Sequence, residues 1–182
     1  KERNIRAIDF RKYTRDLFSD AKLTGVIADF GYPQPLLSKE DYADLCGARI
    51  WEIHRIEPVM VQLSQECQNF AEFREKYRAN LAGALKQDGI VGLKSIIAYR
   101  SGLEIAPKDE KLAADEYEKF KENSYVKAKK LRDYCLHVAM EECTKSDKVM
   151  HIHTGIGDGE VVLQKASPSF LIDMLRDEEY EN

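Results

Sequence analysis

The sequence lacks the features that mark several familiar classes of protein. No stretch approaches the roughly 20 apolar residues that a membrane span needs, and Lys1 does not open a signal peptide. The four cysteines form no closely spaced doublet, which argues against a zinc ribbon or a thiol-exchange motif. No glycine-rich phosphate loop follows the first predicted strand, which argues against a nucleotide-binding domain. We expect free, buried thiols in a cytoplasmic protein.

Neither positive nor negative charge predominates in the sequence. The formal net charge is −4 over 182 residues, and basic side chains are interleaved with acidic ones. Such a distribution gathers neither nucleic acid nor an anionic membrane surface, so neither partner is expected. Hydrophobic residues make up 43% and charged residues 33%, as in an ordinary folded domain. Residues 1–182 are predicted to form a single domain, although a closed eight-stranded barrel takes about 250 residues.

Four short apolar runs alternate with longer amphipathic segments. This alternation is typical of parallel strands joined by crossover helices, and it predicts an α/β fold. The nearly continuous apolar character of the runs indicates strands that are covered on both faces. The predicted strands are 23–30, 49–56, 90–98 and 149–153.

The segments between these strands have helical periodicity. Apolar residues from Leu131 to Ala139 fall on one stripe, so residues 124–144 are predicted to be helical. Ser38 is predicted to cap one helix, and Ser167 with Pro168 to begin the last. The other predicted helices are 9–19, 70–87 and 109–121, and two helices are expected after each of the second and third strands. The proline-containing stretch 31–38 lies where active-site loops occur in α/β folds.

Two histidines end the last predicted strand. His151 and His153 are separated by one residue, so the strand period of two places both imidazoles on the same face. Neutral imidazoles at the carboxyl end of a strand are suited to a divalent metal ion. A pair of this kind is nevertheless a short motif, and taken alone it is more often structural than metal-binding.

Lys94 lies in the middle of an apolar run. A desolvated lysine has a lowered pKa, and it can take up carbon dioxide as a carbamate that bridges metals. The alternative is that its stem lines the core while the ammonium reaches Glu57 or an aspartate. From the residues alone, the structural alternative is favoured.

Further polar residues stand at the predicted strand ends. Glu57 is predicted to end the second strand, and Arg55 lies two positions earlier on the same face. The two side chains could form a salt bridge, or they could steer a substrate carboxylate. Arginine after a strand suits anion binding. Asp29, Tyr99 and Arg100 also lie at or just after predicted strand ends. His54 and His137, by contrast, are expected to be packed structural residues.

Four segments together resemble one family. VMHIHTGIGDGEVVLQKASPSFLIDML resembles the fifth-strand signature of a branch of the amidohydrolase superfamily, and IVGLKSIIAYRSGL resembles its fourth strand. TGVIADFGYP and IHRIEPV resemble the second and third strands. This branch includes predicted TIM-barrel metal-dependent hydrolases and a domain fused to glutamine-synthetase-like sequences. The resemblance implies part of a TIM (β/α)8 barrel, about strands 2 to 5 with their helices.

The resemblance also implies roles for individual residues. His153 would be the fifth-strand metal ligand, Lys94 the fourth-strand lysine that some members carboxylate, and His151 a neighbouring ligand or support. The implied cofactor is a divalent metal, zinc or manganese, which activates water against a C–N or ester bond of a small carboxylate-bearing substrate. The candidates for substrate contact are Arg100, Glu57, Tyr99, Asp29 and Asp158.

The chain departs from the family pattern in three places. The first-strand His-x-His pair, the sixth-strand histidine and the eighth-strand aspartate are absent from the sequence, so the site is incomplete. We expect the missing parts in the full protein, with a half-barrel that forms a homo-oligomer as the alternative. Besides a hydrolase, three functions stay open: a decarboxylase or sugar-acid isomerase on the same fold, a non-catalytic scaffold, and an unrelated doubly wound α/β domain.

Overall fold

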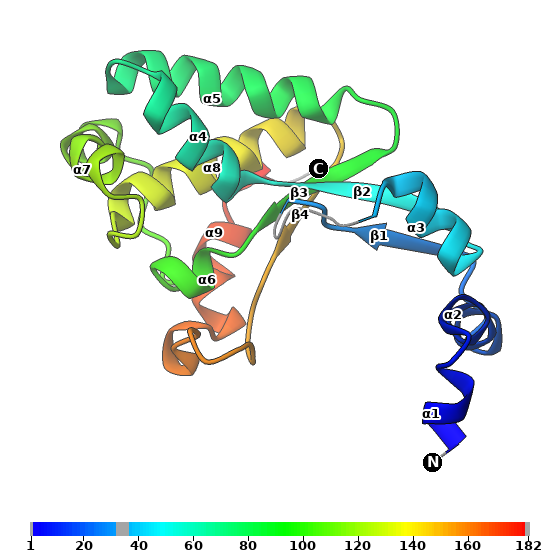
Figure 1. Ribbon diagram of the computed structural model, residues 1–182. Coiled ribbons are helices and arrows are strands. Elements are labelled where there is room, and N and C mark those ends of the chain that lie inside the picture. Colours follow the sequence, from blue (N-terminus) through cyan, green and yellow to red (C-terminus); the bar gives the residue numbers. More distant parts are fainter. Residues whose placement is uncertain (1, 32–36, 181–182) are drawn as a thin grey trace.

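The computed structural model describes residues 2–31 and 37–180, and four parallel strands form its centre (Figure 1). The strands are β1 (Gly25–Ala28), β2 (Arg49–Arg55), β3 (Ile90–Ser95) and β4 (Val149–Ile152). They lie in the order β1-β2-β3-β4, and all three pairings are parallel. The sheet curls into half of a barrel, because each crossover returns the chain to the same side. The predicted α/β class is confirmed.

Helices connect and cover the strands. The predicted alternation of strands and helices is present, and each predicted helix overlaps an observed one. The α-helices are α1 (Glu2–Arg6), α2 (Phe10–Asp20), α3 (Lys39–Cys46), α4 (Ile56–Glu66), α5 (Phe70–Leu85), α6 (Ile97–Arg100), α7 (Glu110–Glu122), α8 (Lys129–Lys145) and α9 (Ile172–Leu175), and the 3-10 helices are η1 (Leu163–Lys165), η2 (Pro168–Leu171) and η3 (Glu178–Tyr180).

Several helix starts follow from their capping residues. The Ser38 hydroxyl accepts a hydrogen bond from the backbone N–H of Asp41 at 3.0 Å, as the sequence predicts for an N-cap. The same helix ends at Gly47, whose φ of 66° is the left-handed conformation that glycine adopts without strain. The segment that begins at Ser167 also starts as predicted, but it divides into η2 and α9 rather than forming one helix.

The predicted ends of three elements are wrong. Residues 56 and 57 begin α4 instead of ending β2, and Pro58 is tolerated in the first helical turn because no intrahelical bond is lost there. The third strand stops at Ser95, and Ile97 begins α6. Helix α8 starts at Lys129 rather than near 124, because Ala128 at φ 35° interrupts the helical backbone.

The helices on one face of the sheet make a continuous hydrophobic core. Helices α4, α5 and α8 lie together on that side (Figure 1). Leu93 of β3 is fully buried against them, and so are Tyr77, Leu131 and Leu136. Full burial of such side chains stabilises the fold by about 1.5–3 kcal/mol each. This layer therefore holds β3 firmly from one side.

The other face of the sheet is concave and partly uncovered. We define the concave face by the side chains that the strand register places together, Ile27, Trp51, Lys94, Val149 and His151. Ile27 is 57% exposed and Val149 60% exposed. The prediction that the strands are covered on both faces is therefore wrong, since the periodicity of a strand does not show what packs on its second face.

Two simpler expectations can be compared directly with the structure. Cys46, Cys67, Cys135 and Cys143 are all buried and free, as predicted. Within the part of the chain that the structure describes, no helix is both long enough and apolar enough to cross a membrane. Residues 32–36 of the predicted proline-containing loop lie outside the described residues.

Candidate metal centre

The parallel register brings polar side chains together at the carboxyl ends of the strands. Lys94 of β3 pairs with Arg55 of β2 on one side and with His151 of β4 on the other. Paired residues of neighbouring strands project from the same face of a sheet, so these three side chains share the concave face. Beyond β4, the backbone N–H of His153 donates to the Ser95 carbonyl at 3.0 Å, which extends the pairing to this histidine.

His153 has one ring nitrogen without a hydrogen-bonding partner. Its Nε2 is buried and bonds to no described residue. The ring packs against Tyr99, with centroids 4.7 Å apart and planes tilted by 49°. Burial lowers the pKa of His153, the positive charge of Lys94 lowers it further, and Asp158 opposes both. The imidazole is therefore held neutral, which is the state that binds a metal ion.

His151 is the more exposed of the two histidines. Burial lowers its pKa as well, followed by repulsion from Lys94 and from His153, while Asp29 acts in the opposite direction. The charges of Lys94 and His153 act on this ring because all three groups gather at one end of the concave face. The predicted placement of both imidazoles on one face agrees with this geometry.

Lys94 is a half-buried amine without a close partner. It forms no ion pair or hydrogen bond with any residue in 2–31 or 37–180. Burial lowers its pKa, and Arg55 lowers it further, whereas Asp29 and Glu57 raise it. The alternative was that the ammonium bonds to Glu57 or to an aspartate, and no such bond is present among the described residues. An amine that loses its proton more easily is a better nucleophile and a better metal ligand.

Asp29 forms an ion pair with Arg55. The Nε and Nη2 atoms of Arg55 donate to Oδ2 of Asp29 at 2.8 and 2.5 Å, and the backbone N–H of Gly31 donates to Oδ1 at 2.9 Å. The predicted pairing of Arg55 with Glu57 is wrong, because Glu57 has turned into α4. Asp29 is thus fixed beside Lys94 with most of its hydrogen-bonding capacity already used.

Glu57 lies beneath the end of β3 rather than on the concave face. Its Oε1 accepts from the Ser95 hydroxyl at 2.7 Å and from the Ile96 N–H at 2.8 Å, while Oε2 is buried without a partner among the described residues. Burial raises the pKa of Glu57, and the two hydrogen bonds oppose that shift. This placement favours support of the strand end over contact with a substrate.

Three of the predicted substrate contacts, Tyr99, Asp158 and Arg100, differ in whether they lie beside His153. The Tyr99 hydroxyl packs so closely on Gly157 that a Cβ there would lie 2.3 Å from it. Asp158 is exposed on the same loop, and its charge acts on His153. Arg100 is exposed at the end of α6, where its charge acts on Arg132 and not on either histidine. Tyr99 and Asp158 therefore adjoin His153, whereas the structure does not bring Arg100 to it.

Sequence reasoning missed Ser95, which connects Glu57 to the histidine strand. Its hydroxyl donates to Glu57, and its carbonyl accepts from His153. A serine inside an apolar run is itself a signal, because a buried hydroxyl requires a partner. The partner could not be named from the sequence, since it depends on Glu57 entering a helix.

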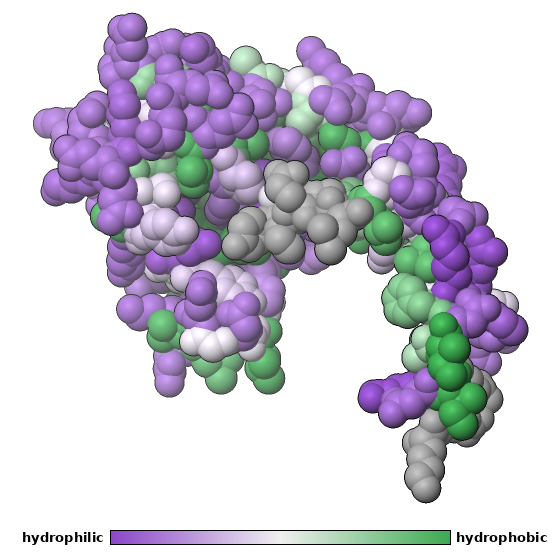
Figure 2. Space-filling view, in the orientation of Figure 1, coloured by the Kyte–Doolittle hydropathy of each residue, from purple (hydrophilic) through white to green (hydrophobic). Residues whose placement is uncertain are grey.

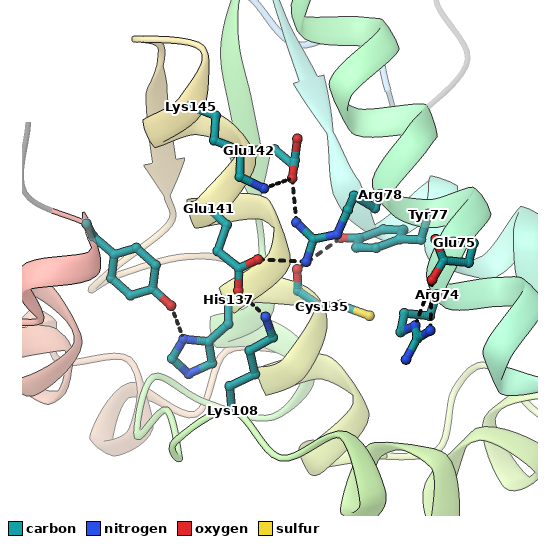
Figure 3. Close-up of polar contacts among 11 residues, drawn as sticks. Arg74, Glu75, Tyr77, Arg78, Lys108, Cys135, His137, Glu141, Glu142 and Lys145 are labelled. Atoms are coloured by element: carbon teal, nitrogen blue, oxygen red, sulfur yellow. Dashed lines mark hydrogen bonds and ion pairs between the residues drawn. The ribbon is translucent and has the colours of Figure 1, made fainter.

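A second polar cluster lies on the helical side of the molecule, between α5 and α8 (Figure 3). Arg78 donates to Glu141 at 2.6 Å and to Glu142 at 2.5 Å, and Lys108 also bonds to Glu141. His137, expected to be structural, bonds through Nδ1 to the Tyr180 hydroxyl and through Nε2 to the Ala106 carbonyl. An adjacent pocket of about 370 Å³ is lined by Arg74, Glu75, Arg78, Lys108, Glu110 and Tyr134. Because its charges are paired with one another, this cluster is a structural feature.

The donors at the concave face fit part of a metal site. Structural and catalytic zinc sites use at least three protein ligands. The described residues contain no group of three or more histidine, cysteine, aspartate or glutamate side chains that could hold a metal ion. They do offer two neutral imidazoles, one with an unpartnered buried nitrogen, and a neighbouring amine with a lowered pKa.

Comparisons with known proteins bear on the fold. No family model matches the chain. A crystal structure of a Lactobacillus casei protein, named "putative metal-dependent hydrolase", superposes with a TM-score of 0.84 and 28% sequence identity. The match covers 91% of this chain and 45% of that one. The chain thus has the fold of rather less than half of a larger α/β protein.

A curated relative matches over a shorter stretch. Protein fluG of Emericella nidulans is 26% identical in an alignment of 116 positions that covers 57% of this chain and 13% of that protein. The chain therefore spans only a small part of this relative and less than half of the solved structure.

Proposed function

We propose that this chain carries part of the active site of a metal-dependent hydrolase of the amidohydrolase superfamily, as the portion around strands 2 to 5 of a TIM barrel. The observation that carries the proposal is the unpartnered Nε2 of His153 beside Lys94 and His151, at the carboxyl ends of parallel strands. Active sites of (β/α)8 enzymes form at that end of the barrel. The solved Lactobacillus casei structure supports the same class.

Three side chains would hold the metal ion. His153 and His151 would coordinate zinc, or manganese, through neutral imidazoles. Lys94 would brace the ion as an amine, or bridge two ions after its nitrogen attacks carbon dioxide, forms an N–C bond and releases a proton. When bound, the ion activates water and polarises the C–N or ester bond of the substrate.

Other residues of the chain would orient these ligands and the substrate. The Tyr99 ring against His153 limits rotation of the imidazole, and Glu57 fixes the backbone that follows Lys94. Asp158, on the loop after β4, is placed to contact a substrate beside His153. Arg100 would neutralise a substrate carboxylate only if the substrate extends toward the end of α6.

A non-catalytic scaffold is the second candidate. The observation that favours it is the absence, among the described residues, of three clustered histidine, cysteine or acidic side chains. A barrel that had lost its metal would keep the packed helical layer but would no longer need metal-binding side chains. The two candidates differ in whether the concave face binds a divalent ion.

Metal content and turnover together test the proposal. The full-length protein that contains this chain is expressed in medium supplemented with zinc or manganese. Its bound metal is measured by mass spectrometry, and small carboxylate-bearing amides and esters are assayed. Wild type is expected to retain a divalent ion and to hydrolyse one of these classes, and His153→Ala to lose both. His54→Ala is the matched control, since His54 pairs with buried Leu93 and faces the helices. A metal-free wild type that is folded and inactive would favour the scaffold.

A further inference from the structure

The imidazole of His153 is held by packing rather than by hydrogen bonds among the described residues. Neither of its ring nitrogens bonds to a described residue. His137 is different, because its Nδ1 bonds to the Tyr180 hydroxyl and its Nε2 to the Ala106 carbonyl. A histidine that binds a metal ion is usually oriented by a hydrogen bond to its second ring nitrogen. Within this part of the chain, the orientation of the His153 ring therefore depends on the side chains that touch it.

Tyr99 provides the aromatic ring that packs on this imidazole. The separation of 4.7 Å between the two ring centroids is one at which aromatic rings attract each other. Tyr99 lies on α6, where its backbone N–H donates to the Ile96 carbonyl at 3.0 Å. The flanking residue Ala98 is buried. Because the backbone is held in this way, the Tyr99 ring can leave the imidazole only by rotating about its own side-chain bonds.

Gly157 lies against the hydroxyl end of the Tyr99 ring. A Cβ atom at this position would be 2.3 Å from the Tyr99 hydroxyl, 2.9 Å from its Cζ and 3.1 Å from a methyl group of Val161. Non-bonded carbon atoms pack at about 3.5–4.0 Å, so a side chain does not fit while the ring stays where it is. The φ angle of Gly157 is not in the left-handed region. The backbone would therefore accept alanine, and it is the neighbouring side chains that exclude it.

The loop between β4 and η1, which carries Gly157, is attached to the body on both sides of this glycine. Before it, the backbone N–H of Gly155 donates to the Ala166 carbonyl at 2.7 Å. After it, Val161 packs against the hydrophobic core. The outward side of the loop is open, since Ile156 is 85% exposed, and Figure 2 shows green, hydrophobic residues at the lower edge of the lobe that this loop and the following helices form. The aromatic ring is thus confined between an attached loop and the imidazole.

We propose that Gly157 is a positioning residue of the candidate metal centre, because it leaves the space in which the Tyr99 ring fixes the His153 imidazole. The inference rests on the proposed function, since the orientation of this ring matters for hydrolysis only if His153 binds a metal ion. Asp158, the proposed substrate contact, directly follows Gly157 in the sequence. The same loop therefore contacts the substrate and positions the metal ligand, and a displacement of the loop is transmitted through Tyr99 to His153.

Alanine substitutions at two glycines of this loop test the proposal in the full-length protein. Gly157→Ala places a methyl group against the Tyr99 hydroxyl, and it is expected to turn the aromatic ring and to change the environment of the His153 imidazole. Gly159→Ala is the matched control, because no atom lies within 4 Å of a Cβ at that position and its φ is not left-handed either. NMR of metal-free protein with isotope-labelled histidine reads the imidazole directly, and His153→Ala assigns its resonances. These resonances are expected to shift in Gly157→Ala and to stay in place in Gly159→Ala.

Calorimetric titration of the same variants with zinc connects the ring orientation to metal binding. Groups that orient a metal ligand typically change metal affinity by about 10- to 100-fold, and Gly157→Ala is expected to lose affinity by about that factor. Tyr99→Phe removes the hydroxyl that the new methyl group would meet at 2.3 Å. Adding Tyr99→Phe to Gly157→Ala is therefore expected to restore part of the lost affinity. A purely structural loss of loop packing would not be restored by removing that hydroxyl.

Thermal melts verify that each variant is folded. If Gly157→Ala does not fold, Tyr99→Leu removes the aromatic ring instead and is expected to shift the same His153 resonances. Resonances that stay in place when either residue is changed, or that move equally in Gly159→Ala, would overturn the proposal, and so would a double variant without recovered affinity. A folded wild type that binds no zinc would overturn the proposed function, and the NMR comparison would still decide whether Gly157 positions the imidazole.

Discussion

The ion-pair cluster on the helical side and the polar side chains of the concave face differ in whether they have partners. On the helical side, Arg78 bonds to both Glu141 and Glu142, and the carboxylates are almost completely buried. On the concave face, Lys94 has no close partner and His153 Nε2 has no hydrogen-bonding partner among residues 2–31 and 37–180. Buried polar groups normally find partners. His54 Nε2 and Glu57 Oε2, which lie off the concave face, also lack one among the described residues, so the contrast is between these two clusters and not between all buried polar groups of the two sides.

The largest effect on stability is expected in the helical layer. Leu131→Ala removes a fully buried side chain of α8 and leaves a cavity, which should lower the free energy of unfolding by about 2–5 kcal/mol. Urea denaturation measures the change. A loss below that range would mean that the layer collapses around the cavity and is less tightly packed than described.

A smaller loss is expected from the ion-pair cluster. Arg78→Ala leaves Glu142 with Lys145 and Glu141 with Lys108, so the cost should be about 1–3 kcal/mol. Because Arg78 is partly exposed, salt screens the pairs that the variant loses, so added salt should reduce the difference from wild type. Thermal unfolding at low and high salt checks this, and a difference that does not respond to salt would point to lost packing instead.

Glu57→Gln should change how stability depends on pH. The folded pKa of Glu57 lies above its ordinary 4.5, so its contribution is fully present below pH 4.5 and is lost as pH rises through the folded pKa. Glutamine does not ionise and can still accept from Ser95 and Ile96. Melting temperatures measured from acid to neutral pH should therefore shift in favour of the variant as pH increases. Parallel curves would show that Glu57 does not titrate in this range.

The smallest effect concerns Asp158, which is exposed. Its charge raises the pKa of His153, so Asp158→Asn should lower that pKa further without changing stability. Titration of the imidazole resonances by NMR measures the shift. An unchanged pKa would show that solvent screens this pair completely.

The strands and most helices follow from local patterns, and they could be predicted from the sequence. Ser38, for example, precedes Lys39, Glu40 and Asp41, and this local sequence is enough to predict an N-cap without knowing where the helix packs. The partners of Arg55 and Glu57 could not be predicted, because they depend on where β2 ends and α4 begins. The open side of the sheet was also unpredictable, since a strand with apolar residues on both faces looks the same whether or not its second face is covered.

Calorimetric titration of the full-length protein with zinc tests the central claim most directly. Wild type is expected to bind the ion, His153→Ala to lose this binding while its melting temperature hardly changes, and His54→Ala to bind like wild type. Equal affinity of His153→Ala and wild type, or no binding by wild type at neutral pH, would contradict a metal centre at the carboxyl ends of these strands.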